Sequence, residues 1–122
     1  MKKPFALIIE DHVHTATIFS AALKQVGYET KIVHDGLNAH DTIKLMSPDV
    51  VVLDLHLPHM SGEQLLDQIR ADERLTKTKV ILASADPLLA KELEQDADLV
   101  LVKPISFDQL SLLSRRLMPE SE

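Results

Sequence analysis

Five short apolar segments alternate along the chain with longer stretches in which apolar residues recur every three or four positions. The short segments predict strands at residues 5–9, 29–33, 50–53, 80–83 and 99–102. Four of them are almost continuously hydrophobic, which is typical of parallel strands covered on both faces, whereas the second alternates as an edge strand does. The pattern therefore predicts a β-α unit that occurs five times.

The longer stretches predict helices at residues 14–26, 39–46, 63–70 and 87–95, and from Ser106 to Leu117. In the first, Ile18, Ala22 and Val26 recur at a spacing of four and form the expected buried stripe. The segments "SGEQ" and "SFDQ" resemble capping boxes that begin at Ser61 and Ser106. The fourth helix is expected to be short.

Alternating strands and helices predict an α/β fold with a parallel sheet, right-handed crossovers and helices on both faces. The 122 residues fit a single domain, 1–122, in which residues 118–122 form a short polar tail. No internal repeat or linker interrupts the pattern.

Composition narrows the possible functions. The formal charge of −6 argues against non-specific binding to nucleic acid or to an anionic membrane, and the chain contains no cysteine. No apolar run approaches the ~20 residues needed to span a bilayer, and "MKKPFALIIEDH" is a poor signal peptide. We therefore expect a cytoplasmic protein. The pair Arg115 and Arg116 is interpreted as the solvated end of a helix.

Polar residues follow the predicted strands at one edge of the sheet. Glu10 and Asp11 follow the first strand, Asp54 the third, Ser84 the fourth and Lys103 the fifth. In open α/β sheets the functional crevice lies at this edge. Three carboxylates close together repel one another unless a cation lies between them, and oxygen ligands suit Mg²⁺, with Mn²⁺ as a possible substitute.

This group of residues suits the transfer of a phosphoryl group to a carboxylate, which forms an aspartyl phosphate. Asp54 would attack the phosphorus in line. Lys103 and the divalent ion would neutralise charge on the phosphoryl oxygens, and Ser84 would donate a hydrogen bond to them.

The motif "DLHLPHMSG" around Asp54 resembles the signature of the receiver domain of two-component response regulators. The acidic pair Glu10-Asp11, the "SA" of Ser84-Ala85 and the "KP" of Lys103-Pro104 lie at the matching places. The resemblance covers essentially the whole chain. It implies a flavodoxin-like (βα)5 three-layer sandwich whose strands lie in the order 2-1-3-4-5.

The resemblance also implies how a metal is held. Asp11 and Asp54 would ligate Mg²⁺ directly, the backbone carbonyl of His56 would supply a third protein ligand, and Glu10 would act mainly through water.

In receivers, the phosphoryl group comes from the phosphohistidine of a sensor histidine kinase or a phosphotransfer protein. The resemblance thus implies that Asp54 is the phosphoacceptor, that Ser84 and Lys103 bind phosphoryl oxygens, and that the Lys103–Pro104 bond is cis. The output would be contact with an unknown downstream protein. Such a domain is no enzyme beyond its own phosphorylation and dephosphorylation.

One departure from the family affects the switch. Three residues before the lysine, receivers usually have Tyr or Phe, and this chain has Val100. We hypothesise that output uses loop and helix movement near Ser84, or that conformational coupling is weak. Leu99 and Val100 could form an exposed partner surface, but buried strand positions are favoured.

The predicted loops around the acidic site carry His12, His14, His56 and His59. Solvated loop residues are favoured over a transition-metal site, because no pair has the i, i+4 spacing of a strong motif. A separate hypothesis is that His56 and Asp86 affect dephosphorylation.

Two other functions remain open. One is a phosphorylation-independent interaction module on the same fold. The other, less favoured, is an aspartate-nucleophile phosphatase, which usually has a second Asp two residues after the nucleophile, where this chain has His56. Flavin binding is disfavoured, because the first loop, "EDHVH", is acidic.

Overall fold

Five parallel strands form one sheet in the order β2-β1-β3-β4-β5. The computed structural model describes residues 3–119. Its strands are β1 (Phe5–Ile9), β2 (Glu29–Val33), β3 (Val50–Asp54), β4 (Lys79–Ser84) and β5 (Leu99–Val102). Its helices are α1 (Val13–Gln25), α2 (Gly36–Leu45), α3 (Gly62–Ala71), the 3-10 turn η1 (Glu73–Leu75), α4 (Pro87–Glu92) and α5 (Phe107–Arg116). The predicted flavodoxin-like topology is confirmed.

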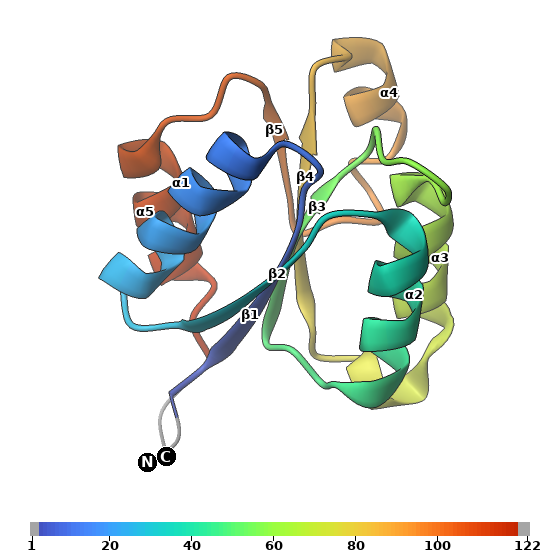
Figure 1. Ribbon diagram of the computed structural model, residues 1–122, viewed down its shortest axis with the longest axis horizontal. Coiled ribbons are helices and arrows are strands. Elements are labelled where there is room, and N and C mark those ends of the chain that lie inside the picture. Colours follow the sequence, from blue (N-terminus) through green and yellow to red (C-terminus); the bar gives the residue numbers. More distant parts are fainter. Residues whose placement is uncertain (1–2, 120–122) are drawn as a thin grey trace.

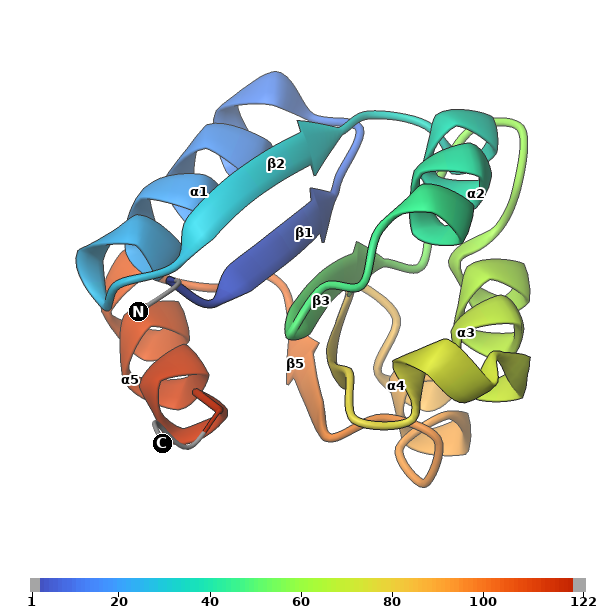
Figure 2. The ribbon, with the colours of Figure 1, turned by 90° about the horizontal axis from the view of Figure 1, so that it is seen from below.

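Helices cover both faces of the sheet, so the domain has three layers. Figures 1 and 2 show α1 and α5 on one side of the sheet and α2 and α3 on the other. Successive residues of a strand point to opposite faces. In β1, Ala6 and Ile8 therefore belong to the core beneath α1 and α5, whereas Leu7 and Ile9 belong to the core beneath α2 and α3. Both faces need apolar residues, which explains the continuous hydrophobic runs.

The predicted strands agree with the structure to within one residue. The third and fourth extend further than predicted, so that Asp54 and Ser84 are the last residues of β3 and β4. The capping box at Ser61 is complete, because the side chains of Ser61 and Gln64 each accept a hydrogen bond from the other's backbone N–H. At Ser106 only half of the predicted box forms, through the Gln109 N–H. The fourth helix is short, as predicted.

Two predictions about packing were wrong in part. Ile18 was expected in the buried stripe of the first helix, but its side chain is 46% exposed, whereas Phe19 and Leu23 are buried. Residues four apart do not line up exactly on a helix of 3.6 residues per turn. The stripe of Ile18, Ala22 and Val26 therefore follows only one edge of the buried face. Met118 was assigned to the polar tail but packs against the core. Residues 120–122 of that tail lie outside the described residues.

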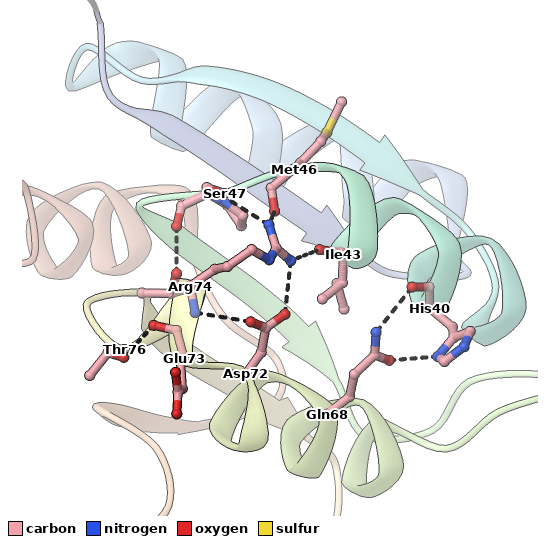
Figure 3. Close-up of polar contacts among 11 residues, drawn as sticks. His40, Ile43, Met46, Ser47, Gln68, Asp72, Glu73, Arg74 and Thr76 are labelled. Carbon is pink, nitrogen blue, oxygen red and sulfur yellow. Dashed lines mark hydrogen bonds and ion pairs between the residues drawn. The ribbon is translucent and has the colours of Figure 1, made fainter.

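At the strand-start end of the sheet, Arg74 closes the end of α2 (Figure 3). Its guanidinium donates to the carbonyl oxygens of Ile43 at 2.9 Å and Met46 at 3.3 Å. The same group pairs with the Asp72 carboxylate at 2.8 Å. The last carbonyls of a helix have no partner within it, and a cation there also complements the helix dipole. Arg74 therefore joins η1 to α2.

Arg70 makes a comparable set of contacts from α3. Its guanidinium donates to the carbonyl oxygens of Asp96 at 2.7 Å and Thr78 at 3.1 Å. It also pairs with the Asp98 carboxylate at 3.0 Å, and the same carboxylate accepts the Val80 N–H. These bonds fasten α3 to the segments that lead into β4 and β5. None of the described helices has both the length and the apolar composition that a bilayer crossing requires.

Candidate functional site

The carboxyl ends of the strands bring the predicted site residues together. Lys103 lies in the loop after β5, and its Nζ bonds to Glu10 Oε1 at 2.5 Å and lies 3.5 Å from Asp54 Oδ2. One ammonium therefore serves two carboxylates that come from different strands. A carboxylate oxygen of Asp11 lies within 4.8 Å of one of Glu10.

Glu10 is completely buried. Besides its bond to Lys103, its other carboxylate oxygen, Oε2, accepts the His12 N–H at 3.2 Å. Its backbone oxygen lies 3.0 Å from His34 Nδ1. A buried carboxylate is costly unless it is paired, so the direct contact with Lys103 explains how Glu10 remains at this position. This direct pairing, and the contact with His34, could not be read from the sequence.

Asp54 is nearly buried at the end of β3, and its Oδ1 accepts the His56 N–H at 3.1 Å. Burial raises the pKa of the Asp54 carboxyl to about 7, and the neighbouring Glu10 acts in the same direction. The His56 N–H and Lys103 oppose this rise in pKa. Such a pKa means that protons and cations compete for this carboxylate near neutral pH.

Asp11 behaves differently from Asp54. Burial on its own would raise the pKa of Asp11, but interactions with Glu10 and Asp54, and the proximity of His12, outweigh it and lower the pKa. Its Oδ1 atom is buried and has no hydrogen-bond partner among residues 3–119. A buried, unpaired carboxylate oxygen is rare, because leaving it unpaired costs free energy. The donor set and this free oxygen fit a hard divalent cation.

Ser84 ends β4 and is buried. Its hydroxyl accepts the Asp86 N–H at 3.0 Å and donates to the Asp86 carbonyl oxygen at 3.3 Å. Asp86 itself caps α4, since its carboxylate accepts the N–H groups of Leu88 and Leu89. The Ser84 hydroxyl thus lies at the sheet edge, hydrogen-bonded to the turn that starts α4.

Pro58 and Gly62 shape the loop after Asp54, as expected from the sequence. The Pro58 carbonyl accepts the N–H of Gly36, where α2 begins. A Cβ at Gly62 would lie 2.5 Å from the backbone oxygen of Asp54, so no larger residue fits without moving the strand end. Between them, His59 has a φ of 73°. His56 is exposed on the same loop.

Comparison with known proteins identifies the family. The response regulator receiver domain family matches residues 6–114. The chain belongs to this family. The receiver domain of a putative LuxO repressor from Vibrio parahaemolyticus is 33% identical, with a TM-score of 0.85 over 95% of this chain and 90% of that one. The receiver of the sensor histidine kinase PA1611 from Pseudomonas aeruginosa is 25% identical, with a TM-score of 0.83 over 95% and 98%. That structure holds a magnesium ion in its active-site cleft.

Curated relatives of this receiver are longer proteins. The transcriptional regulatory protein TrcR of Mycobacterium tuberculosis is 29% identical over 117 residues, which is 94% of this chain but 45% of TrcR. The chain therefore spans less than half the length of this relative. Receivers are signalling modules, and they occur both in response regulators and in histidine kinases. Membership of the family therefore places this chain in two-component signalling, but it does not identify a specific partner.

The predicted switch position, Val100, packs against one of the two cores of the domain. Val100 is half-buried in β5 and packs against the core beneath α2 and α3. Leu89 of α4 and Leu93, which follows that helix, pack against the same core. Leu99 is also half-buried and packs into the opposite core. Both are strand residues, as the favoured interpretation predicts, but each is half-buried rather than buried. The Lys103–Pro104 bond is cis, as predicted.

A groove of about 410 Å³ lies beside Lys103. It is lined by Thr15, Ile18 and Phe19 of α1 and by Pro104 and Ile105 of the loop after β5. The exposed side chain of Ile18 is therefore part of a surface next to the site.

Proposed function

We propose that this receiver accepts a phosphoryl group on Asp54 from the phosphohistidine of a sensor histidine kinase or a phosphotransfer protein. The observation that supports this most directly is the position of Asp54 at the end of β3, between the Lys103 ammonium and the His56 N–H. A rigid strand end with a cation 3.5 Å away suits a carboxylate that must meet an incoming anionic group.

In the proposed reaction, a carboxylate oxygen of Asp54 bonds to phosphorus while the phosphorus–nitrogen bond of the phosphohistidine breaks. The electron pair of that bond stays on the imidazole, which takes up a proton. Lys103 is placed to balance negative charge on the phosphoryl oxygens, because electrostatic stabilisation is the main contribution to this class of reaction. The Ser84 hydroxyl would exchange its bond to the Asp86 carbonyl for one to a phosphoryl oxygen.

Mg²⁺ or Mn²⁺ would be held by Asp11, Asp54 and the backbone carbonyl of His56, with Glu10 acting through water. When bound, such an ion neutralises negative charge on the transferring group. The free buried oxygen of Asp11 supports this assignment, as does the magnesium ion of the PA1611 receiver. Glu10 already bonds to Lys103, which fits an indirect role.

The proposed output is binding of a downstream protein rather than catalysis on another substrate, within the cytoplasm. Because Val100 is an aliphatic side chain packed in the core, we propose that the signal passes through the turn at Ser84 and Asp86 into α4. Asp86 joins the two, since it bonds to the Ser84 hydroxyl and caps α4. His56 and Asp86 flank the site and are proposed to influence dephosphorylation.

Phosphoryl uptake tests this function. The chain is incubated with Mg²⁺ and acetyl phosphate, and the covalent phosphoryl group is measured by intact-protein mass spectrometry. Wild type should be modified, Asp54→Asn should lose at least 99% of the uptake (roughly 10²-fold) because its nucleophile is gone, and Asp72→Asn, at the opposite end of the sheet, should match wild type. Wild type without any uptake would favour the phosphorylation-independent interaction module.

A further inference from the structure

The turn between β2 and α2 contacts the acidic pair of the site. His34 follows β2 directly, and its Nδ1 atom lies 3.0 Å from the backbone oxygen of Glu10. A carbonyl oxygen can only accept a hydrogen bond, so His34 Nδ1 is the donor. The neutral Nδ1–H tautomer and the imidazolium both provide this donor, so the bond does not depend on the charge of the ring. His34 thus joins the end of β2 to the end of β1.

This bond fixes the peptide group between Glu10 and Asp11. That group is planar, and its oxygen is the one that accepts from His34. The Glu10 N–H donates to the Val33 carbonyl at 3.0 Å, so Glu10 is bonded to the end of β2 through both of its backbone groups. The buried Oδ1 of Asp11 has no hydrogen-bond partner in the described part of the chain. The backbone therefore determines where this oxygen lies, and His34 holds that backbone.

The same turn also contacts the loop that follows Asp54. Gly36, the first residue of α2, donates its N–H to the Pro58 carbonyl at 3.0 Å. A Cβ on Gly36 would collide with the backbone oxygen of Met60, so the two backbones are in direct contact. Residues 34–36 therefore bridge the two loops that carry the proposed metal ligands, without supplying a ligand themselves.

We propose that His34 is a positioning residue for the divalent ion of this site. Its hydrogen bond holds the Glu10–Asp11 peptide in the orientation that presents the Asp11 carboxylate to the ion. This role rests on the proposed function, since the ion belongs to it. Groups that orient metal ligands typically change metal affinity by about 10- to 100-fold when they are removed. Mg²⁺ keeps several of its waters and depends on few protein ligands, so we expect the lower end of this range.

A Mg²⁺ titration of the full chain, without a phosphoryl donor, tests this role. The dissociation constant is measured from amide NMR shifts at neutral pH. His34→Ala should raise it about tenfold, because the Glu10–Asp11 peptide loses its donor. His34→Leu, which keeps the bulk of the side chain but has no donor, should behave in the same way. His34→Asn should remain within about twofold of wild type, because its amide N–H replaces the Nδ1–H of the ring.

His40→Ala is the matched control. The Nδ1 of His40 lies 2.7 Å from Gln68 Oε1, between α2 and α3, so this variant also loses one hydrogen bond of an imidazole (Figure 3). Its Mg²⁺ affinity should stay within about twofold of wild type. Phosphoryl uptake from acetyl phosphate provides a second readout. In His34→Ala the Mg²⁺ concentration for half-maximal uptake should rise about tenfold, whereas uptake at saturating Mg²⁺ should be unchanged. A loss of stability alone would not separate these two quantities.

Four results would overturn the role of His34. They are a wild type without measurable Mg²⁺ affinity, an unchanged affinity in folded His34→Ala and His34→Leu, an equal loss in His34→Asn, and an equal loss in His40→Ala. The proposed function fails separately. A chain whose Mg²⁺ affinity depends on His34 but which takes up no phosphoryl group would overturn that function alone. A chain that is phosphorylated on Asp54 and has the same Mg²⁺ affinity in every variant would overturn the role of His34 alone.

Discussion

The two ends of the sheet differ in how completely their charged side chains are paired. At the strand-start end, the guanidinium groups of Arg70 and Arg74 each pair with a carboxylate and with backbone carbonyls. At the carboxyl end, a single ammonium, Lys103, meets the carboxylates of Glu10 and Asp54, and a buried oxygen of Asp11 has no hydrogen-bond partner among the described residues.

This difference separates stability from function. Paired charges with complete hydrogen bonds hold elements together, and the arginines do so between α2, α3 and the start of β4 and β5. Crowded, buried carboxylates repel one another and destabilise a fold unless a ligand completes them, and carboxylates with perturbed pKa values are frequent at functional sites. Removing a charge at the strand-start end should therefore lower the free energy of unfolding and leave phosphoryl uptake unchanged. Removing a charge at the carboxyl end should instead reduce phosphoryl uptake.

The largest expected difference is between two lysines. Lys103→Met removes the cation at the carboxyl end, and phosphoryl uptake from acetyl phosphate should fall about 10²- to 10³-fold, the range seen when one stabilising group of a site is lost. Lys79→Met is the matched control, since Lys79 is 3.9 Å from Asp98 at the other end and 49% exposed. Intact-protein mass spectrometry of both variants, with circular dichroism to verify folding, provides the comparison. Equal uptake by folded Lys103→Met and wild type would contradict the role of the ammonium.

The strands, and the edge of the sheet at which the site residues meet, could be predicted from the sequence for a physical reason. A strand between two helical layers must be apolar on both faces, and Val51 and Val52 of β3 point into opposite cores. Parallel strands all end at one edge, so acids after strands, such as Asp11 and Asp54, must meet there.

Contacts between distant segments could not be predicted in the same way. Arg74 bonds to Ile43, 31 residues away, and nothing in the local sequence indicates its partner. The direct bond of Lys103 to Glu10 spans 93 residues, and only the packed sheet edge decides that Glu10 rather than Asp11 receives it. The burial of Phe19 in place of Ile18 likewise depends on where α1 rests on the sheet.

A smaller effect, on stability rather than on phosphoryl uptake, is expected from replacing Arg74 at the end of α2. Arg74→Ala leaves the carbonyls of Ile43 and Met46 without their side-chain donor, and the free energy of unfolding should fall by about 1–2 kcal/mol, the scale of charge-assisted bonds at a partly exposed site. Phosphoryl uptake should be unchanged at temperatures well below unfolding. Denaturant titration measures the first quantity and mass spectrometry the second.

The matched control for this loss is Arg116→Ala, in the exposed last turn of α5, which should change the unfolding free energy by less than about 0.5 kcal/mol. If Arg74→Ala reduced phosphoryl uptake without changing stability, the division between a stabilising end and a functional end would be wrong.

The most gradual effect concerns pH, and its sign differs between the two ends. In chelator-treated protein, burial raises the pKa of Asp54 from 3.8 to about 7. Between these values the folded state holds a proton that the unfolded state has released, so stability falls as pH rises from about 4 to 7, by at most about 1.4 kcal/mol per pH unit. Asp72 shows the reverse, because hydrogen bonding to Arg74 lowers its pKa. The stability that Asp72 provides is present above its ordinary pKa and is lost as pH falls through the lowered value.

Urea titrations across pH 3 to 8 with chelator should therefore separate the two ends within one protein. Asp54→Asn should flatten the decline between about pH 4 and 7, since the variant carries no proton to release there. Asp72→Asn should instead flatten the loss at acid pH, because the carboxylate that Arg74 favours is gone. If Asp54→Asn kept the wild-type slope above pH 4, the raised pKa of Asp54 would not be the cause of the decline in stability.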